Sequence, residues 1–346
     1  MQELLLQWYD RAARDLPWRV KGGRDEPYRV WISEVMLQQT RVEAVIPYYA
    51  RFLHALPDIP ALAAVDTDTL YKLWEGLGYY SRARNLREAA CICVSRYAGM
   101  LPDSRAALLE LPGIGDYTAG AIASIAYGER VPAVDGNVLR VWARFTADAR
   151  DILDVGVRRE MRDAVAEIVP QNRPGDFNQA MMELGATLCG PNTAPRCEEC
   201  PLRDSCRGYA DGIAALLPTR APKKPRRVEE LTVILPYAQG RLGLRRRGES
   251  MVLAGQWEYP NVPGTLDEAG IVETLRTWEL NPTKLTPLPP AKHLFTHIEW
   301  RMTAWRADVE KASPALTWAS PDEIAASYAL PSAFKAWRPQ GGTVSG

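Results

Sequence analysis

One carboxylate stands where a charge is unexpected. Glu34 lies in the middle of an apolar segment around residues 30–37, and a glutamate there normally sits on the solvated face. Burial would instead raise the pKa of this carboxyl, because a low-dielectric environment disfavours the charged form. A carboxyl that keeps its proton near neutral pH suits a general acid. The residues predicted to form the core around it are Val30, Ile32, Val35 and Met36.

A second carboxylate, Asp135, follows a hairpin of small residues that could hold a phosphate. The hairpin LPGIG contains Gly113 and Gly115, which can leave backbone amides uncovered beside the start of a helix near Asp116. That helix is apolar on one face, and Asp135 lies in the irregular Asp-Gly-Asn loop before the next helix. Taken singly, Gly-x-Gly is a weak signal, and Asp-Gly-Asn is often only a turn and a helix cap.

Four of the six cysteines are clustered in a pattern typical of a metal site. Cys91 and Cys93 fall in a helical segment and are predicted to be core thiols without chemistry. The other four follow the spacing C-x₇-C-x₂-C-x₅-C. Thiolates at such spacing bind tetrahedral zinc or an iron–sulfur cluster, and the residues alone do not decide between them. The four are Cys189, Cys197, Cys200 and Cys206.

An aromatic and basic segment could contact nucleic acid. Tyr79 and Tyr80, predicted to be exposed, follow a glycine-rich turn, and three arginines occupy the start of the next helix. Aromatic rings can stack on bases and guanidinium groups can neutralise phosphates, although a solvated loop and helix face would look the same.

Length and hydrophobic period predict two domains. The chain has 346 residues, with 42 basic and 42 acidic side chains, so any attraction to nucleic acid must be local. Apolar residues recur with a helical period through about residue 189, and then with a period of two after residue 230. We expect a helical region over 1–210, a Pro-rich basic linker over 211–229 and an α+β domain over 230–340. Because no apolar run is long enough for a membrane span, we expect a soluble intracellular protein.

The ordered motifs resemble a known family of DNA repair enzymes. LPGIGDYTA followed by VDGNV, together with WISEVMLQQT, resembles the helix-hairpin-helix endonuclease III superfamily, and within it the adenine DNA glycosylases. The resemblance implies that Glu34 is the catalytic acid and that Tyr117 packs in the pocket. It also implies that Asp135 stabilises the positively charged sugar and that Asn137 orients Asp135 or the attacking water. The hairpin of residues 111–126 would bind DNA through Gly113 and Gly115. Gln39 would be a wedge pushed into the DNA stack, and Tyr79 would intercalate near the base opposite the target.

The same resemblance extends to the cysteines and the C-terminal domain. It implies that a 4Fe–4S cluster binds in the loop of residues 189–206, although the family's first gap is usually one residue shorter. LRRRGESMVLAGQWEYP resembles the Nudix-like domain of adenine glycosylases, but no Nudix metal box lies between Gly255 and Asn281. The implied reader of 8-oxoguanine is Phe295-Thr296-His297. The family more often has Ser at position 296, and His297 could also be a hydrogen-bonded strand residue.

The expected activity is therefore base excision. The chain would be a monomeric, cytoplasmic and nucleoid-associated hydrolase that flips adenine out of duplex DNA and cleaves its N-glycosidic bond opposite 8-oxoguanine or guanine. Two other functions stay open, a glycosylase/lyase acting on oxidised pyrimidines and a non-catalytic iron–sulfur DNA-binding protein. Tyr117 weighs against the lyase, because that branch has a lysine at this position of the hairpin helix.

Overall fold

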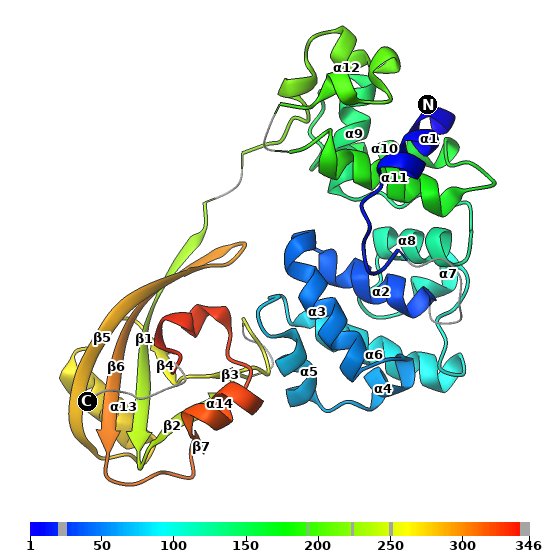
Figure 1. Cartoon of the computed structure of the whole chain (residues 1–346). Helices are drawn as coiled ribbons and strands as arrows, with labels where there is room; N and C mark the ends of the chain where they lie inside the picture. Colours follow the sequence, from blue (N-terminus) through cyan, green and yellow to red (C-terminus); the bar gives the residue numbers. More distant parts are fainter. Residues whose placement is uncertain (20–25, 192–193, 223–224, 249–251, 340–346) are drawn as a thin grey trace. The chain divides into compact units, whose positions relative to one another are not determined.

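The computed structural model describes residues 1–346 except 20–25, 192–193, 223–224, 249–251 and 340–346. Packing divides the chain into two compact units (Figure 1). Unit 1 comprises Met1–Val65 and Arg84–Pro222, and unit 2 comprises Asp66–Ala83 and Lys223–Gly346. The prediction of a helical region followed by an α+β region is confirmed.

The chain before residue 211 forms helices and short 3₁₀ turns. The α-helices are α1 (Gln2–Ala12), α2 (Glu26–Leu37), α3 (Val42–Ala55), α4 (Ile59–Ala64), α5 (Thr67–Trp74), α6 (Ser81–Arg96), α7 (Arg105–Leu108), α8 (Asp116–Ala126), α9 (Gly136–Thr146), α10 (Val155–Glu167), α11 (Pro174–Thr187) and α12 (Arg207–Ala210). The 3₁₀ turns are η1 (Cys197–Glu199), η2 (Arg203–Ser205) and, just beyond, η3 (Ala214–Leu216).

Helix α2 is the buried centre of unit 1. Its side chains from Val30 to Met36 are all buried, because the helix is apolar on nearly every side and must be enclosed by other helices. The predicted core positions on this helix are among them. Glu34 has no solvated face to occupy, and only 6% of its surface is exposed.

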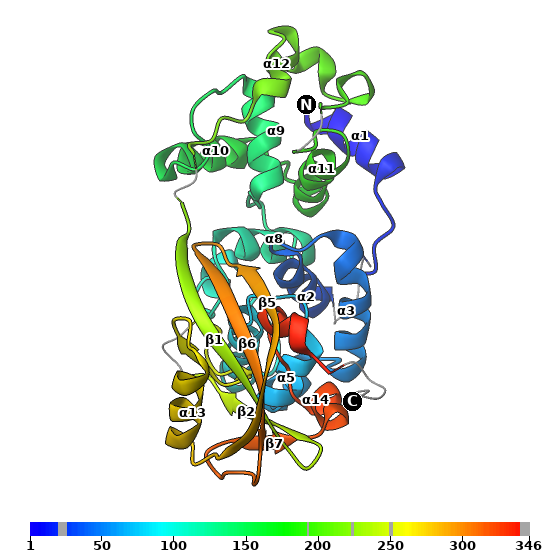
Figure 2. The ribbon, with the colours of Figure 1, turned by 90° about the vertical axis from the view of Figure 1, so that its left-hand side faces the viewer.

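Three further helices place the Asp-Gly-Asn loop in the core of unit 1. Helix α8 packs against α2 and α11, and α11 packs against α9 (Figure 2). A Cβ at Gly120 of α8 would lie 2.1 Å from the carbonyl oxygen of Pro132, so glycine lets the loop before α9 rest directly on α8. Asn178 of α11 fixes the same loop by accepting a hydrogen bond from Ala133 N at 3.0 Å and donating one to the Val131 carbonyl at 2.9 Å.

Unit 2 contains one mixed sheet. Its strands are β1 (Arg227–Ala238), β2 (Arg241–Arg246), β3 (Trp257–Glu258), β4 (Asn261–Pro263), β5 (Pro282–Leu294), β6 (Ile298–Val309) and β7 (Thr317–Ala319). The order is β3-β2-β1-β6-β5, with β4 beside β1 and β7 beside β2. β1 and β6 run parallel, and the other pairs are antiparallel. β1 and β2 form a hairpin, and both of its turn residues, Gln239 and Gly240, have positive φ as a type I′ turn requires.

Alternating residues of β1 serve two cores on opposite faces of the sheet. Val233 and Leu235 join a core with the C-terminal segment, which includes α14 (Pro321–Ser327) and η4 (Ser332–Trp337). Ile234 points the other way, into a core with α13 (Glu268–Thr277). This period of two is the sequence signal that predicted the second domain.

Residues 66–83 pack with unit 2, which the sequence boundaries did not anticipate. Asp68 pairs with Arg246 and accepts a hydrogen bond from Trp257 Nε1 at 3.0 Å. Glu75 pairs with Arg338 at 2.8 Å. Helix α5 is therefore a surface element of the C-terminal unit, although it lies far from that unit in sequence.

The exposure predicted for two residues was wrong. Tyr80 is 5% exposed and packs edge-on against Tyr71, so only Tyr79 of the tyrosine pair is exposed. Cys91 is exposed and only Cys93 is buried, because residues two apart on a helix point to different sides. Strand β5 was not predicted, since its four prolines argue against a central strand, but β5 lies at the sheet edge, where proline is tolerated.

Candidate active site

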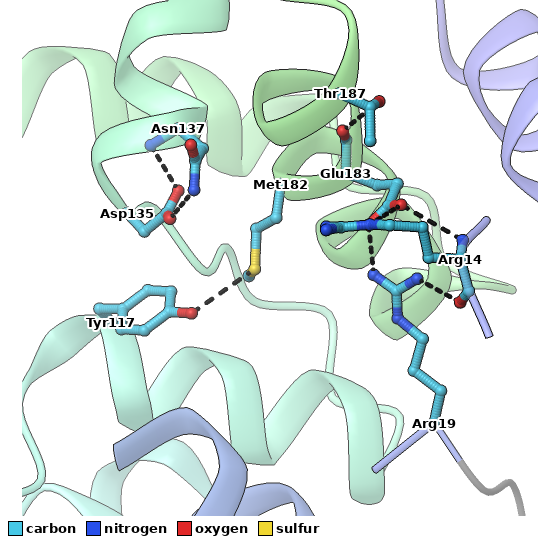
Figure 3. Close-up of polar contacts among 8 residues, drawn as sticks. All are labelled: Arg14, Arg19, Tyr117, Asp135, Asn137, Met182, Glu183 and Thr187. Atoms are coloured by element: carbon cyan, nitrogen blue, oxygen red, sulfur yellow. Dashed lines mark hydrogen bonds and ion pairs between the residues drawn. The ribbon is translucent and has the colours of Figure 1, made fainter. Parts of the chain in front are cut away.

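Glu34 meets the hairpin helix in a polar contact inside the core. The Tyr117 hydroxyl of α8 donates a hydrogen bond to the Glu34 carboxylate and lies 3.5 Å from Sδ of Met182 on α11. Figure 3 shows the Tyr117 hydroxyl directed at Met182, with Asp135 and Asn137 at the start of α9. Burial is the main reason that the pKa of Tyr117 is raised well above its ordinary value, so this hydroxyl keeps its proton.

Asp135 is the N-cap of α9 and is held on both carboxylate oxygens. Oδ1 accepts hydrogen bonds from Asn137 N at 2.9 Å and Val138 N at 2.8 Å. Oδ2 accepts one from Asn137 Nδ2 at 2.6 Å. The carboxylate therefore satisfies the amides at the positive end of a helix, an arrangement that favours its negative charge.

The surroundings of the two carboxyl groups favour different protonation states. Burial raises the pKa of Glu34 to about 7, the Tyr117 hydrogen bond lowers it, and the charge of Asp135 raises it further. Burial also raises the pKa of Asp135, but the hydrogen bonds from Val138 and Asn137 oppose that rise. Because Asp135 accepts three hydrogen bonds, the negative charge belongs on Asp135 and the proton on Glu34.

A chain of hydrogen bonds links Asp135 to the first clustered cysteine. Asn137 Oδ1 accepts a bond from Arg140 Nη2 at 2.7 Å, and Arg140 Nε donates to the Cys189 carbonyl at 2.8 Å. Arg144 Nη1 then lies 3.2 Å from the Cys189 sulfur. Both arginines are 4% exposed, so they are fixed parts of the core of unit 1.

A buried ion-pair group ties the segment before α2 to α11. Glu183 is 1% exposed and receives Arg14 at 2.6 Å and Arg19 at 2.7 Å (Figure 3). Although burial alone would raise the pKa of Glu183, the two arginines lower it, so Glu183 stays ionised between them. Arg19 also lowers the pKa of Glu34, which places its positive charge near the site.

The glycine hairpin lies between α7 and α8 as predicted. Gly113 has φ +76°, and a Cβ there would lie 2.7 Å from Asn85, so only glycine fits. Gly115 is the N-cap of α8, makes no side-chain cap, and has open space where a Cβ would point. The first amides of α8 are thus left for another acceptor. Gln39 is exposed in the turn after α2 with a positive φ of 59°.

The predicted reader residues lie in unit 2, in the turn between β5 and β6. The Phe295 ring packs edge-on against Trp300, with ring centroids 4.8 Å apart, while Thr296 and His297 are exposed. The Tyr79 hydroxyl lies 3.1 Å from Thr296 Oγ1. Tyr79 is 48% exposed and has a φ of 48°, rare for a residue with a side chain.

The cysteine cluster forms one compact feature of unit 1. Cys189, Cys197, Cys200 and Cys206 line a single small cavity together with Arg144 and Tyr209. Within the described part of the chain, no three His, Cys, Asp or Glu side chains are placed to hold a single metal ion.

Sequence reasoning missed the arginines and the methionine that contact the candidate site residues or their supports. Arg140 and Arg144 follow Asn137 at helical spacings of three and seven, so the motif itself places them on the same helix face. Arginine on a helix is usually solvated, which hid this signal. Met182 and Glu183 carried no local signal, because their role depends on how α11 packs.

Two segments of the chain match known protein families. Residues 32–167 match the HhH-GPD superfamily base excision DNA repair protein family, and residues 231–337 match the NUDIX domain. Glu34, Tyr117 and Asp135 fall inside the first match, and the β5–β6 turn falls inside the second. The fold and the site thus define a base excision DNA repair glycosylase, a hydrolase, with a Nudix-like C-terminal domain.

Relatives and solved structures narrow this class. The adenine DNA glycosylase of Rattus norvegicus is 35% identical over 96% of this chain and 77% of its own length. The adenine DNA glycosylase of Homo sapiens is 35% identical over 97% of this chain and 73% of its own length. The structure of a thermostable thymine-DNA glycosylase is 28% identical, with a TM-score of 0.54, covering 60% of this chain and 94% of that one. The chain belongs to the adenine DNA glycosylase family. Across the residues described, no helix is long and apolar enough to cross a membrane.

Proposed function

We propose that this protein hydrolyses the N-glycosidic bond of adenine mispaired with 8-oxoguanine or guanine in duplex DNA. The observation that carries the proposal is the unequal carboxyl pair. Burial raises the pKa of Glu34 to about 7, so the group retains its proton close to neutral pH, and three accepted hydrogen bonds favour the anion of Asp135. Departure of adenine needs a proton on the base and a negative charge near the sugar, and this pair supplies both.

The bond-breaking step uses these groups in a fixed order. Adenine leaves the stack, because its glycosidic bond is out of reach inside a duplex. Glu34 gives its proton to a ring nitrogen of the base, N7 in the family mechanism, and general acid help of this kind contributes typically ~10²–10⁴ in rate. The C1′–N9 bond breaks, and Asp135 stabilises the positive sugar until water adds to it. Asn137 orients Asp135, and Tyr117 holds Glu34 in place.

Binding to DNA would use residues of both units. In unit 1, Gly113 and Gly115 expose amides suited to a backbone phosphate, and Gln39 protrudes from a tight turn. In unit 2, Tyr79 and Thr296 are already in contact, which supports a common target nucleotide. We infer that this target is the base opposite adenine, read by Phe295, Thr296 and His297.

We also propose that the four clustered cysteines hold a 4Fe–4S cluster. The thiols share one cavity but are not placed around a single ion. Thiolates bind both zinc and iron–sulfur clusters, and the resemblance to the glycosylase family favours the cluster. The cluster would stabilise the loop structurally, and the hydrolysis has no redox step.

The cofactor proposal is tested by colour and metal content. We expect purified protein to be yellow-brown with visible thiolate-to-iron absorption, and Cys197→Ser to lower folding yield or DNA affinity. Cys91→Ser, at an exposed thiol outside the cluster, is the matched control and should change neither. Colourless protein with stoichiometric zinc would overturn the cluster.

The function is tested by single-turnover release of adenine from duplexes carrying A opposite 8-oxoguanine, G, C or T. We expect the fastest release opposite 8-oxoguanine. Release of an oxidised pyrimidine in place of adenine would reject the proposal. Borohydride trapping is the second readout, because a lyase forms a Schiff base and Tyr117 cannot. An adduct as abundant as that of a true lyase would favour the bifunctional alternative.

A further inference from the structure

A second polar cavity in unit 1 is lined by three arginines. It has a volume of about 440 Å³ and lies between α9 and the segment of residues 215–220. Among the residues that the structure describes, its charged lining consists of Arg140, Arg144 and Arg220, without an acidic side chain. The volume falls in the range of small-ligand pockets, roughly 300–1,000 Å³. Asp135 acts on the charge of Arg140, and the Cys189 sulfur lies 3.2 Å from Arg144 Nη1, so the least compensated positive charge at the cavity is that of Arg220.

Arg144 lines both this cavity and the cysteine cavity, and its guanidinium is only partly bonded. Its Nε donates to the Leu217 carbonyl at 2.8 Å, and its Nη1 is shared among the Cys189 carbonyl, the Cys189 sulfur and the Gly190 carbonyl. Among the described residues, Nη2 has no acceptor. Arg144 is only 4% exposed, so this amino group is held in place by the rest of its side chain. A buried guanidinium with one free edge is prepared to bind an anion.

Arg220 provides a second donor from a segment that is anchored to unit 1. The Leu217 carbonyl is bound by Arg144, and the Thr219 carbonyl accepts a hydrogen bond from Ile152 N at 3.2 Å. Arg220 follows directly and is exposed, and no carboxylate pairs with it among the described residues. Backbone anchoring on one side and a free guanidinium on the other allow Arg220 to close over a bound anion.

We propose that Arg144 Nη2 and Arg220 form a phosphate-binding site, with Arg140 supplying further positive charge. Arginine suits phosphate because its planar donors match two phosphate oxygens at once. The phosphate could be a DNA backbone phosphate or free phosphate, and both present the same oxygens. The site is separate from the glycine hairpin and from the carboxyl pair, and it does not depend on which base is released.

The test compares Arg220→Gln with Arg220→Lys, which keeps the charge, and with Arg96→Gln, which removes an exposed arginine of unit 1 outside the cavity. Full-length proteins bind an undamaged duplex over a range of salt concentrations, so no base needs to be released. Each phosphate contact contributes ~0.9 to the slope of log K against log salt. For a backbone phosphate, we expect Arg220→Gln to reduce the slope by about that amount, while Arg220→Lys and Arg96→Gln nearly retain it.

Inorganic phosphate, added without DNA and followed by ³¹P line broadening, separates the two sources. Broadening by the wild type that Arg220→Gln abolishes, with an unchanged salt slope for DNA, would assign the site to free phosphate. An unchanged slope together with no difference in broadening overturns the proposal. An equal loss of slope in Arg96→Gln also overturns it, because net charge would then explain the effect. None of these results depends on whether the protein releases adenine.

Discussion

The site of Glu34 and Asp135 (the carboxyl site) differs from the turn of Phe295, Thr296 and His297 (the recognition turn). The difference is how many of their polar groups already have hydrogen-bond partners. The Asp135 carboxylate accepts three hydrogen bonds, and Glu34 is buried against Tyr117. Thr296 and His297 are exposed, and the side-chain contact of Thr296 is with the Tyr79 hydroxyl. Catalysis gains from dipoles fixed before the substrate arrives, whereas recognition requires groups whose remaining bonds are made by the ligand. The two roles proposed for these regions therefore make opposite demands on their polar groups.

The largest effect should come from removing either ionisable group of the carboxyl site. Glu34→Gln and Asp135→Asn keep shape, and each should lower single-turnover adenine release by ~10³ or more while duplex affinity stays nearly unchanged. Glu43→Gln, at an exposed position of α3, is the control and should leave release unchanged. Parallel loss of binding and release would mean that the two carboxyl groups have a structural role. The contrast between a catalytic carboxyl site and a recognition turn would then fail.

The pH dependence of release should report Glu34. The protonated form is the acid, and burial raises its pKa to about 7, so the acid is available below pH 7. As pH rises through 7 the acid is lost, and the rate should fall about tenfold per pH unit. Single-turnover rates between pH 5 and pH 9 measure this. A break near pH 4.5, the ordinary value, would mean that the carboxyl is not desolvated in the active complex.

A smaller and more selective effect is expected in the recognition turn. Thr296→Ala/His297→Ala should reduce the preference for A opposite 8-oxoguanine over A opposite G by a factor corresponding to ~1–3 kcal/mol. Release opposite G should change less, since the carboxyl site is untouched. Thr283→Ala, an exposed threonine at the start of β5, is the control. An unchanged preference in the double variant would remove the reading role from this turn.

The smallest effect should come from Tyr79→Phe, which removes the hydroxyl that contacts Thr296 and keeps the ring. A single neutral hydrogen bond is worth ~0.5–1.5 kcal/mol, so the preference for 8-oxoguanine should fall only a few-fold. In the Thr296→Ala background the same change should have no further effect, because the partner is already absent. Additive effects in this double-mutant cycle would show that the two hydroxyls act independently.

The two carboxyl groups of the site could be predicted from the sequence more fully than the side chains that hold the site in place. Burial of Glu34 could be inferred because α2 is apolar on nearly all sides, and a cap at Asp135 because Asp-Gly-Asn precedes a helix. The bond from Arg140 to Asn137 could not, since a helical arginine is solvated by default. Neither could the burial of Glu183, which depends on Arg14 from a distant segment.

In unit 2 the alternation of residues along the strands could be predicted from the sequence, but not which strand lies at the edge of the sheet. β1 alternates between two cores, and a period of two reveals such a strand. β5 carries prolines that are compatible with a strand only at a sheet edge, and edge position is a property of the assembled sheet. The packing of α5 with unit 2 is likewise a property of the tertiary structure. The amphipathic pattern of α5 shows that one face is buried, but not which surface it packs against.

The packing of residues 66–83 with the C-terminal unit restricts how the two units can be exchanged or dissected. A chimera that takes residues 223–346 from a relative would separate Asp68 and Glu75 from the partners Arg246, Trp257 and Arg338. A cut in the linker would leave α5 attached to the helical part without its partner surface. Transplantable boundaries therefore lie at three points of the chain, near residues 65, 83 and 222, and a functional graft must carry two separate segments.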